Sequence, residues 1–195
     1  MSRIAKITRK TNETEITLEL NLDGSGLYEI HTGVGFFDHM LAGFARHGLF
    51  DLNLKVTGDL EVDDHHTIED TGIVLGQAIR EAAGDKKGIR RYGSSILPMD
   101  ETLVMTACDL CGRPYFAWQG EFSADQMGGM STAMVREFFY AVSYSAEMNL
   151  HMRILDGCND HHKAEALFKS FAKTLDMATS KDPRIEDVLS TKGSL

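Results

Sequence analysis

The residues best suited to chemistry form one short motif, Asp-His-His-x-x-Glu, which occurs twice, at residues 64–69 and 160–165. Residues three or four apart share a face of an α-helix, so each glutamate lies with both histidines of its motif. A histidine and a glutamate one turn apart can chelate a divalent ion. A single His-x-x-Glu is usually a solvated polar turn. Two copies, each led by Asp and preceded by a matching strand pattern, predict metal binding.

The paired histidines predict two metal ions rather than one. Adjacent helical residues project about 100° apart, so one helix cannot easily turn both rings onto a single ion. Two ions, each taking one histidine of each pair, would use all four imidazoles and both carboxylates. Such ligands with open coordination positions suit Mn²⁺, with Fe²⁺, Co²⁺ or Zn²⁺ as alternatives.

Two further histidines are candidate ligands, whereas the two aspartates of the motifs are not. His151 lies in a strand between two apolar residues and therefore points away from the core face. His39 stands at a helix start beside an aspartate, and both histidines are expected as additional ligands. Asp64 and Asp160 directly precede apolar-periodic runs, which is typical of helix N-caps. We expect these aspartates to cap their helices rather than to coordinate metal.

The elements that must position these residues repeat along the chain. Apolar alternation predicts strands, and helical periodicity predicts helices. The expected strands are 14–22, 52–56, 103–107 and 150–154, and the expected helices are 37–47, 65–83, 134–148 and 161–178. A shift of 96 positions places 53–69 on 149–165 without a gap. The sequence therefore predicts an α+β fold of two duplicated halves, 1–93 and 94–195, each a small sheet backed by two helices within one compact unit.

The composition fits a globular protein and excludes several functions. The chain has 195 residues, 43% of them hydrophobic, and a net charge of −9, which argues against general nucleic-acid binding because that needs a basic surface. Its apolar stretches are too short to span a membrane and no secretory signal is visible, so we expect a cytoplasmic protein, or a mature one whose targeting segment is missing from this sequence. The odd cysteine count agrees with reduced thiols. The pair Cys108-x-x-Cys111 is interpreted as two thiols near a strand end rather than as a zinc or redox site.

Both histidine motifs extend into longer signatures, at residues 63–72 and 159–169. With these go four shorter segments, at 36–41, 46–51, 112–114 and 190–193. Together they resemble the conserved segments of imidazoleglycerol-phosphate dehydratases, and the likeness spans essentially the whole chain. No phosphatase domain stands ahead of the signatures in this sequence, so the resemblance is to the monofunctional form.

The resemblance implies a fold, an assembly and a metal. The family fold is a duplicated βα unit of the ribosomal protein S5 domain 2-like kind. Trimers place the sites between subunits, and eight trimers form a 24-mer with two Mn²⁺ ions in each active site. The matching ligands are His39, His65, His66, Glu69, His151, His161, His162 and Glu165. At Gly43, where some relatives carry glutamine, this chain has no side chain to contact the substrate.

The resemblance also implies the reaction, removal of water from imidazoleglycerol phosphate to give imidazoleacetol phosphate in histidine biosynthesis. Two ions a ring's width apart suit this substrate because each imidazole nitrogen can bind one. Glu13 matches a family position at the substrate and is expected to help protonate the departing hydroxyl, while Glu165 is expected to act as base as well as ligand. Water held by a metal is the alternative acid or base. The matching phosphate contacts are Arg91, Arg113, Lys169, Ser190 and Lys192.

Two other functions share the same ligands. A two-metal hydrolase of a small phosphorylated metabolite needs a bridging hydroxide, and such sites tend to be richer in aspartate. A non-catalytic metal-binding or storage assembly needs no acid or base. Ketone formation from imidazoleglycerol phosphate with added Mn²⁺, measured beside phosphate release, would distinguish the three functions. We expect the chain to form a homo-oligomer. We expect neither nucleic acid nor a membrane as a partner.

Overall fold

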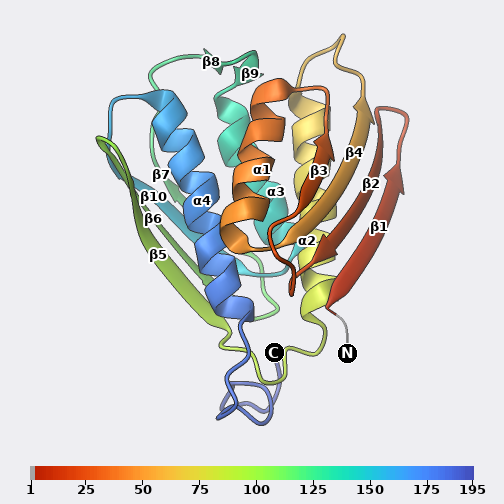
Figure 1. The fold of residues 1–195 in the computed structure, drawn as a ribbon, viewed down its shortest axis with the longest axis vertical. Helices are drawn as coiled ribbons and strands as arrows, with labels where there is room; N and C mark the ends of the chain where they lie inside the picture. The colour runs from red at the N-terminus through yellow and green to blue at the C-terminus, as the bar shows by residue number, and fades with distance from the viewer. Residues whose placement is uncertain (1–2) are drawn as a thin grey trace.

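The computed structural model describes residues 3–195, in which four helices lie between two four-stranded sheets (Figure 1). The helices are α1 (Gly35–Gly48), α2 (His65–Ala83), α3 (Ala133–Ser145) and α4 (Asp160–Thr179). The first sheet contains β1 (Ile4–Lys10), β2 (Thr14–Asn21), β3 (Tyr28–His31) and β4 (Asp51–Gly58). The second sheet contains β5 (Tyr92–Met99), β6 (Thr102–Asp109), β7 (Tyr115–Gln119) and β10 (Asn149–Asp156). A small hairpin joins β8 (Gln126–Met127) to β9 (Met130–Ser131).

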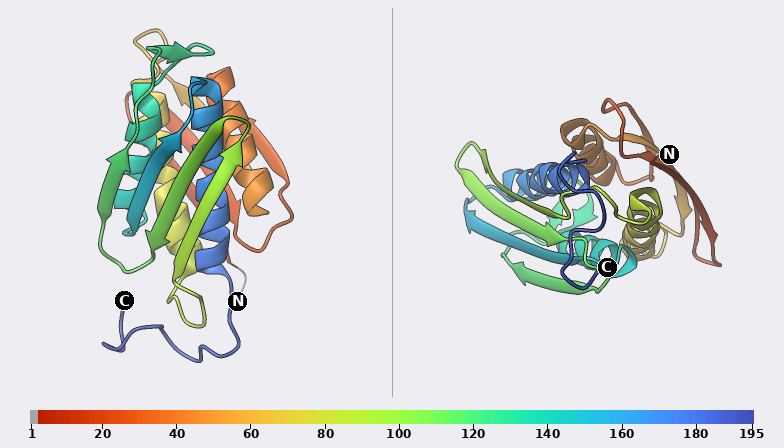
Figure 2. Two further views of the ribbon diagram at one scale, coloured as in Figure 1. Left: turned by 90° about the vertical axis from the view of Figure 1, so that its left-hand side faces the viewer. Right: turned by 90° about the horizontal axis from the view of Figure 1, so that it is seen from below.

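The two halves have the same topology. The first sheet has the order β1-β2-β4-β3 and the second the order β5-β6-β10-β7. In each sheet the first three strands in this order are paired antiparallel. The fourth strand, β3 or β7, is parallel to its neighbour. Figure 2 shows both sheets on the outside, with the helices between them. The predicted α+β fold built from a duplicated unit is confirmed.

The strands that the sequence pattern did not predict are the edge strands β1, β3, β5 and β7, together with the β8–β9 hairpin. An edge strand has one neighbour and buries fewer side chains, so its apolar alternation is weak. The helix predicted at 65–83 has those bounds, whereas α3 ends at Ser145, three residues before the predicted end. It ends there because Glu147 adopts a φ of 52° and the Met148 amide turns back to Ser143, which leads the chain into β10.

The alternating apolar residues that predicted β6 lie on the outer face of the second sheet. Val104 and its alternate neighbours are buried against the helices, whereas Leu103 and Met105 face outward and are half-buried. Ile96 and Leu155 are exposed on the neighbouring strands. The first sheet instead presents charged residues outward, with ion pairs such as Lys6–Glu19 across its strands. The two duplicated sheets therefore differ in the polarity of their outer faces.

A phenylalanine cluster fixes the helices that carry the histidines. Phe37 of α1 lies 5.2 Å from Phe138 of α3, and Phe138 stacks on Phe168 of α4 at 5.2 Å between ring centroids. All three side chains are buried, and each such burial contributes about 1.5–3 kcal/mol. Because α1 and α4 share this core, the distance between their first turns is set by packing. No helix within residues 3–195 combines the length and apolarity needed to cross a membrane.

Candidate metal and active site

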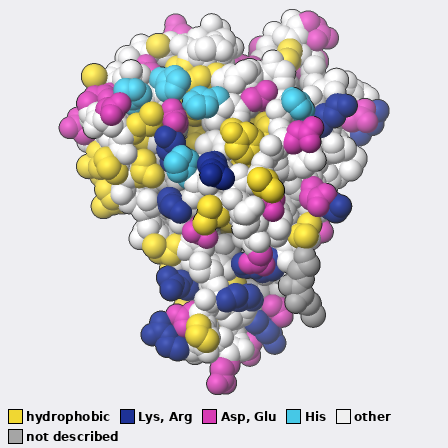
Figure 3. Space-filling model, in the orientation of Figure 1, with side chains coloured by type: hydrophobic (Ala, Val, Ile, Leu, Met, Phe, Trp, Pro, Cys, Tyr) yellow, Lys and Arg dark blue, Asp and Glu magenta, His cyan; other side chains and the backbone are white. Residues whose placement is uncertain are grey.

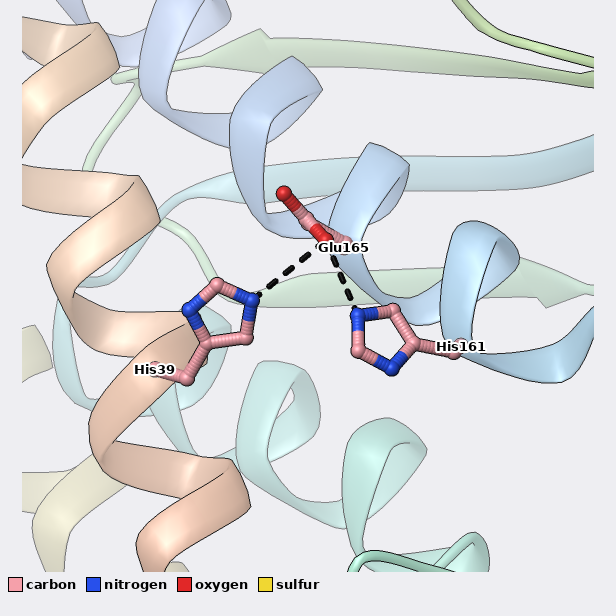
Figure 4. Close-up of side chains that lie close together, drawn as sticks. All are labelled: His39, His161 and Glu165. Carbon is pink, nitrogen blue, oxygen red and sulfur yellow. Dashed lines mark hydrogen bonds and ion pairs between the residues drawn. The ribbon is translucent and has the colours of Figure 1, made fainter.

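Three of the predicted ligands meet where α1 and α4 begin. Nε2 of His161 lies 3.1 Å from Oε2 of Glu165, and Nε2 of His39 lies 3.4 Å from the same oxygen (Figure 4). The three ligand atoms all lie within 4.8 Å of one another. Within residues 3–195, no other group of three or more histidine, cysteine or carboxylate side chains has its ligand atoms this close together.

Local and tertiary structure contribute differently to this cluster. His161 and Glu165 are four residues apart on α4, so helix geometry alone brings them together. His39 comes from the beginning of the second turn of α1 and reaches them because α1 packs on α4. Phe36 supports the arrangement, because its ring packs edge-to-face on the His161 ring with 5.1 Å between the ring centroids. Histidine side chains gather at the end of the molecule opposite the C-terminal tail (Figure 3).

Glu165 is ionised in this setting. Burial opposes its ionisation, but the hydrogen bond from Lys169, at 2.6 Å, and the nearby His39 and His161 outweigh burial and lower its pKa. The side chain is only 12% exposed, whereas both histidine rings face solvent. One anionic oxygen between two imidazole nitrogens is a donor set that Mn²⁺, Fe²⁺, Co²⁺ and Zn²⁺ accept. The residues present therefore fit a divalent ion.

The first copy of the motif forms a matching pair, which no third ligand joins within residues 3–195. His65 Nε2 lies 3.5 Å from Glu69 Oε2, one turn apart on α2. The rings of adjacent histidines diverge as expected from helix geometry. His65 contacts Glu69 whereas His66 contacts Asp59. His161 contacts Glu165 whereas His162 contacts Glu101. Each pair thus presents its two rings to different neighbourhoods.

His66 and His162 each contact a carboxylate that the sequence pattern did not single out. His66 Nδ1 lies 3.0 Å from Asp59, and His162 Nδ1 lies 2.8 Å from Glu101. The hydrogen bond to the carboxylate is the main reason that the pKa of each histidine is raised. For Glu101 a signal existed in the sequence, because Asp-Glu-Thr at 100–102 resembles Asn-Glu-Thr at 12–14.

His151 stands apart from the other candidates. It is exposed on the outer face of β10, where its ring lies 5.7 Å from the ring of Tyr115. In one chain, therefore, His39, His161 and Glu165 meet, His65 pairs with Glu69, and the rest of the predicted ligands are dispersed: His66, His151 and His162.

The expectation that both motif aspartates cap their helices is wrong. Asp64 occupies the N-cap position of α2, but its carboxylate accepts from the Ser131 amide instead. The N-cap of α4 is Asn159, whose side chain accepts from the first turn, and Asp160 lies inside the helix. There Asp160 accepts from Ser123 and from a neighbouring amide at 2.8 Å. Both aspartates hold the segment around the β8–β9 hairpin against the helix ends, contacts that no local pattern encodes.

We predict that Asp160→Ala lowers the free energy of unfolding by about 3–5 kcal/mol, because it leaves the buried Lys163 without its partner at 2.9 Å. Asp176→Ala, which breaks a more exposed pair with Lys173, is the matched control and should cost under about 1 kcal/mol. Urea unfolding at neutral pH measures both. Equal midpoints for the two variants would contradict the prediction.

The Asp160 carboxylate should also make the stability of the fold depend on pH in the acid range. Burial alone would raise the pKa of Asp160, but bonds from Lys163, Ser123 and Ala124 outweigh it and lower the pKa from 3.8 to about 2. A depressed pKa means that the stabilisation is present above pH 3.8 and is lost as the pH falls towards 2. Asp160→Asn should therefore lose stability at neutral pH and show a flatter acid transition than wild type.

The predicted phosphate contacts lie mainly at the other end of the fold. Arg91 forms a bidentate pair with Asp109, at 2.7 and 3.0 Å, and donates to the Leu189 carbonyl. Arg91 and Tyr92 line a pocket together with residues 184–191 of the tail, and the Lys192 amide donates to the Ser190 hydroxyl. This pocket joins the strand that begins the second sheet to the C-terminal tail.

Helix length separates this pocket from the histidine cluster. The Arg91 amide bonds to Ala178 near the end of α4, and His161 lies at its beginning. Seventeen residues of α-helix span roughly 25 Å. Of the predicted phosphate contacts, Lys169 alone touches the cluster, through Glu165. Within one chain, a small substrate cannot reach both groups.

Two more cations belong to the tail end of the fold. Arg113 is exposed in the turn after β6, and its carbonyl accepts from Asn149 at the start of β10. Lys86, which the sequence pattern did not single out, is buried. Its Nζ lies close to Gly112, 3.7 Å from the ideal Cβ position of that glycine. Burial is the main cause that lowers the pKa of Lys86. Arg113 and Lys86 thus lie at the same end of the molecule as Arg91, which is paired with Asp109.

The chain matches a known protein family over most of its length. The sequence profile of imidazoleglycerol-phosphate dehydratase matches residues 32–175. The chain belongs to the imidazoleglycerol-phosphate dehydratase family. A dehydratase of this name from Lachnoclostridium phytofermentans is 64% identical over 195 residues, all of both chains, and one from Acetivibrio thermocellus is 59% identical over the same length.

Solved structures agree with this assignment. The crystal structure of imidazoleglycerol-phosphate dehydratase from Staphylococcus aureus is similar with a TM-score of 0.84 at 38% identity, over 92% of this chain and 99% of that one. The Pyrococcus furiosus enzyme gives 0.82 at 35% identity, over 97% and 100%. As a family member the chain is a hydro-lyase, and imidazoleglycerol-phosphate dehydration is a step of histidine biosynthesis.

Proposed function

We propose that this chain dehydrates imidazoleglycerol phosphate with two Mn²⁺ ions in each site. The observation that carries the proposal is the cluster of His39, His161 and Glu165, whose three ligand atoms lie within 4.8 Å. Duplication supplies the second set of ligands. The residues that would hold the ions are His39, His65, His66, Glu69, His151, His161, His162 and Glu165.

When bound, the ions would stabilise negative charge that develops on the substrate's imidazole ring. The rest of the chemistry falls to side chains. Loss of water requires a proton for the departing hydroxyl and a base for the adjacent C–H. Glu13 is exposed, with Oε1 3.7 Å from His66 Nε2, and could deliver a proton at that side of the site. Glu165 is held ionised by Lys169 and can accept one.

We propose that each active site combines two subunits. The separation of roughly 25 Å along α4 keeps Arg91, Ser190 and the metal cluster of one chain from sharing a substrate. A second copy could bring its tail pocket to the cluster, with Arg113 and Lys192 beside the phosphate. Arginine forks and lysine suit that anion.

The assembly that we propose is a 24-mer of eight trimers. The apolar outer face of the second sheet, including Ile96, Met105 and Leu155, is the surface that supports it, since exposed apolar patches mark protein contacts. His151 lies on the same sheet face and would join a site only through contact with another copy. Light scattering with and without Mn²⁺ tests the assembly. We also propose a cytoplasmic location, because Cys108 and Cys111 are free thiols that a reducing compartment would preserve.

The activity itself has a direct test. Purified protein stripped of metal and reloaded with Mn²⁺ should form a ketone from imidazoleglycerol phosphate, followed by absorbance, and release no inorganic phosphate. Activity should vanish with a chelator and return with Mn²⁺. Phosphate release without ketone would contradict dehydration and indicate a hydrolase, and the absence of both products would indicate metal storage.

Deleting residues 190–195 should raise KM at least tenfold while bound Mn²⁺ is unchanged. The deletion removes Ser190 and Lys192, and each charge-assisted bond to a phosphate contributes about 1.5–3 kcal/mol. Deleting only Ser194 and Leu195 is the control and should leave KM near the wild-type value. An unchanged KM in the longer deletion would refute a role of the tail in phosphate binding.

A further inference from the structure

The duplication places two glutamates at equivalent points of the two halves. Glu13 directly precedes β2 and Glu101 directly precedes β6, which are equivalent central strands of sheets with the same order. His66 and His162 are equivalent positions of the two motifs. Glu13 lies 3.7 Å from Nε2 of His66, whereas Glu101 lies 2.8 Å from Nδ1 of His162. Equivalent glutamates therefore face opposite nitrogens of equivalent rings.

In the first half another carboxylate takes the Nδ1 side. Asp59 follows β4, and its two oxygens lie 3.0 and 3.2 Å from Nδ1 of His66. Glu13, in contrast, makes no side-chain hydrogen bond with any residue in 3–195, and its side chain is 53% exposed. Asp59 thus contacts Nδ1 of His66 as Glu101 contacts Nδ1 of His162.

In the second half Glu101 is fixed from two directions. Its Oε2 contacts His162 Nδ1, while its Oε1 accepts from the backbone amides of Asn159, at 2.8 Å, and Cys158, at 3.2 Å. The Thr102 hydroxyl donates to the same oxygen at 3.1 Å. These donors leave Glu101 little freedom to move towards a substrate.

We propose that Asp59 and Glu101 are positioning residues that hold His66 and His162 as the tautomers protonated at Nδ1, leaving Nε2 of each ring as the metal-binding atom. A carboxylate that accepts from one ring nitrogen fixes the orientation of the ring and increases the basicity of the other nitrogen. The inference rests on the metal dependence proposed above. It also explains why equivalent glutamates diverge: Asp59 occupies the Nδ1 side of His66, which leaves Glu13 free on the Nε2 side.

The two carboxylates predict different results on amide replacement. In Glu101→Gln, the amide oxygen must stay with the two backbone donors, so the amide nitrogen faces His162 Nδ1. A donor there forces the ring proton to Nε2 and removes the ligand atom. In Asp59→Asn, the side chain has no other partner in residues 3–195 and can turn its oxygen to His66. Glu101→Gln should therefore lose metal affinity, Asp59→Asn should largely keep it, and Asp59→Ala should lose it.

The experiment measures Mn²⁺ binding to the full chain by electron paramagnetic resonance, without turnover. We expect affinity to fall about 10- to 100-fold in Glu101→Gln and Asp59→Ala. His162→Ala is the reference for a lost ligand. Glu15→Gln is the matched control, because Glu15 is exposed and pairs with Lys10 at 2.6 Å away from His66 and His162, and it should bind as wild type does.

Two results would overturn this inference in different ways. Normal Mn²⁺ affinity in both Glu101→Gln and Asp59→Ala, beside a loss in His162→Ala, would refute the positioning role and leave metal dependence intact. Failure of the wild-type chain to bind Mn²⁺ would refute metal dependence and the inference with it. Asp59 and Glu101 lie in different loops, so circular dichroism of each variant shows whether one has failed to fold, and the other still decides the question.

Discussion

Replacing Glu165 by glutamine is expected to lower kcat by about a thousandfold and to release Mn²⁺ from the site. The carboxylate is the centre of the cluster, since His39, His161 and Lys169 all contact it. A neutral amide of the same shape binds a divalent ion weakly, leaves the lysine without a counter-charge and cannot act as a base. One substitution thus removes a ligand and a reactive group together.

The matched control for Glu165→Gln lies on the same helix. Asp176 pairs with Lys173 at 3.8 Å near the end of α4, and Asp176→Asn should leave turnover and metal content near wild type. Metal content by plasma mass spectrometry and kcat with added Mn²⁺ are both measured. Full metal occupancy with near-normal turnover in Glu165→Gln would contradict the ligand role as well as the base role.

Glu13→Gln is expected to behave differently, with kcat lowered about 10²- to 10⁴-fold while Mn²⁺ content is unchanged. Glu13 lies 3.7 Å from His66 Nε2 and is not among the proposed ligands, so its loss removes a proton donor rather than a metal. The amide keeps the size of the side chain but cannot exchange a proton at neutral pH.

The control for Glu13→Gln is two residues further along the chain, on β2. Glu15 points outward and pairs with Lys10 at 2.6 Å, so Glu15→Gln changes the same charge in the same sheet away from His66. Its kcat should remain within about twofold of wild type, the range expected of an exposed ion pair. Metal-replete Glu13→Gln with near-normal turnover would rule out the acid role.

The two variants separate the two halves of the duplicated site. Loss of metal and activity together points to Glu165 in the second motif, and loss of activity alone points to Glu13 before the first central strand. If Glu101→Gln also loses metal, the equivalent glutamates Glu13 and Glu101 will have been shown to serve different tasks, one towards the substrate and one towards His162.

Much of this protein could be predicted from its sequence because the signals are local. The 96-residue repeat is visible as identical residues at matching positions of the sequence. The helix over 65–83 and the pairing of His161 with Glu165 depend on the periodicity of helices. The same geometry predicted that adjacent histidines diverge, as the different carboxylate partners of the two histidines in each motif show. The substrate came from the resemblance rather than from any such pattern.

Tertiary structure decided what lies between the elements. Packing brings His39 of α1 to the pair on α4 and places Asp59 against His66. The carboxylates of Asp64 and Asp160 accept hydrogen bonds from the segment around the β8–β9 hairpin instead of capping their helices. Tertiary structure also set the tail pocket roughly 25 Å along α4 from His161. A helix repeats every 3.6 residues and so fixes distances within itself, whereas distances between helices, strands and loops are fixed by the packing of side chains far apart in the chain.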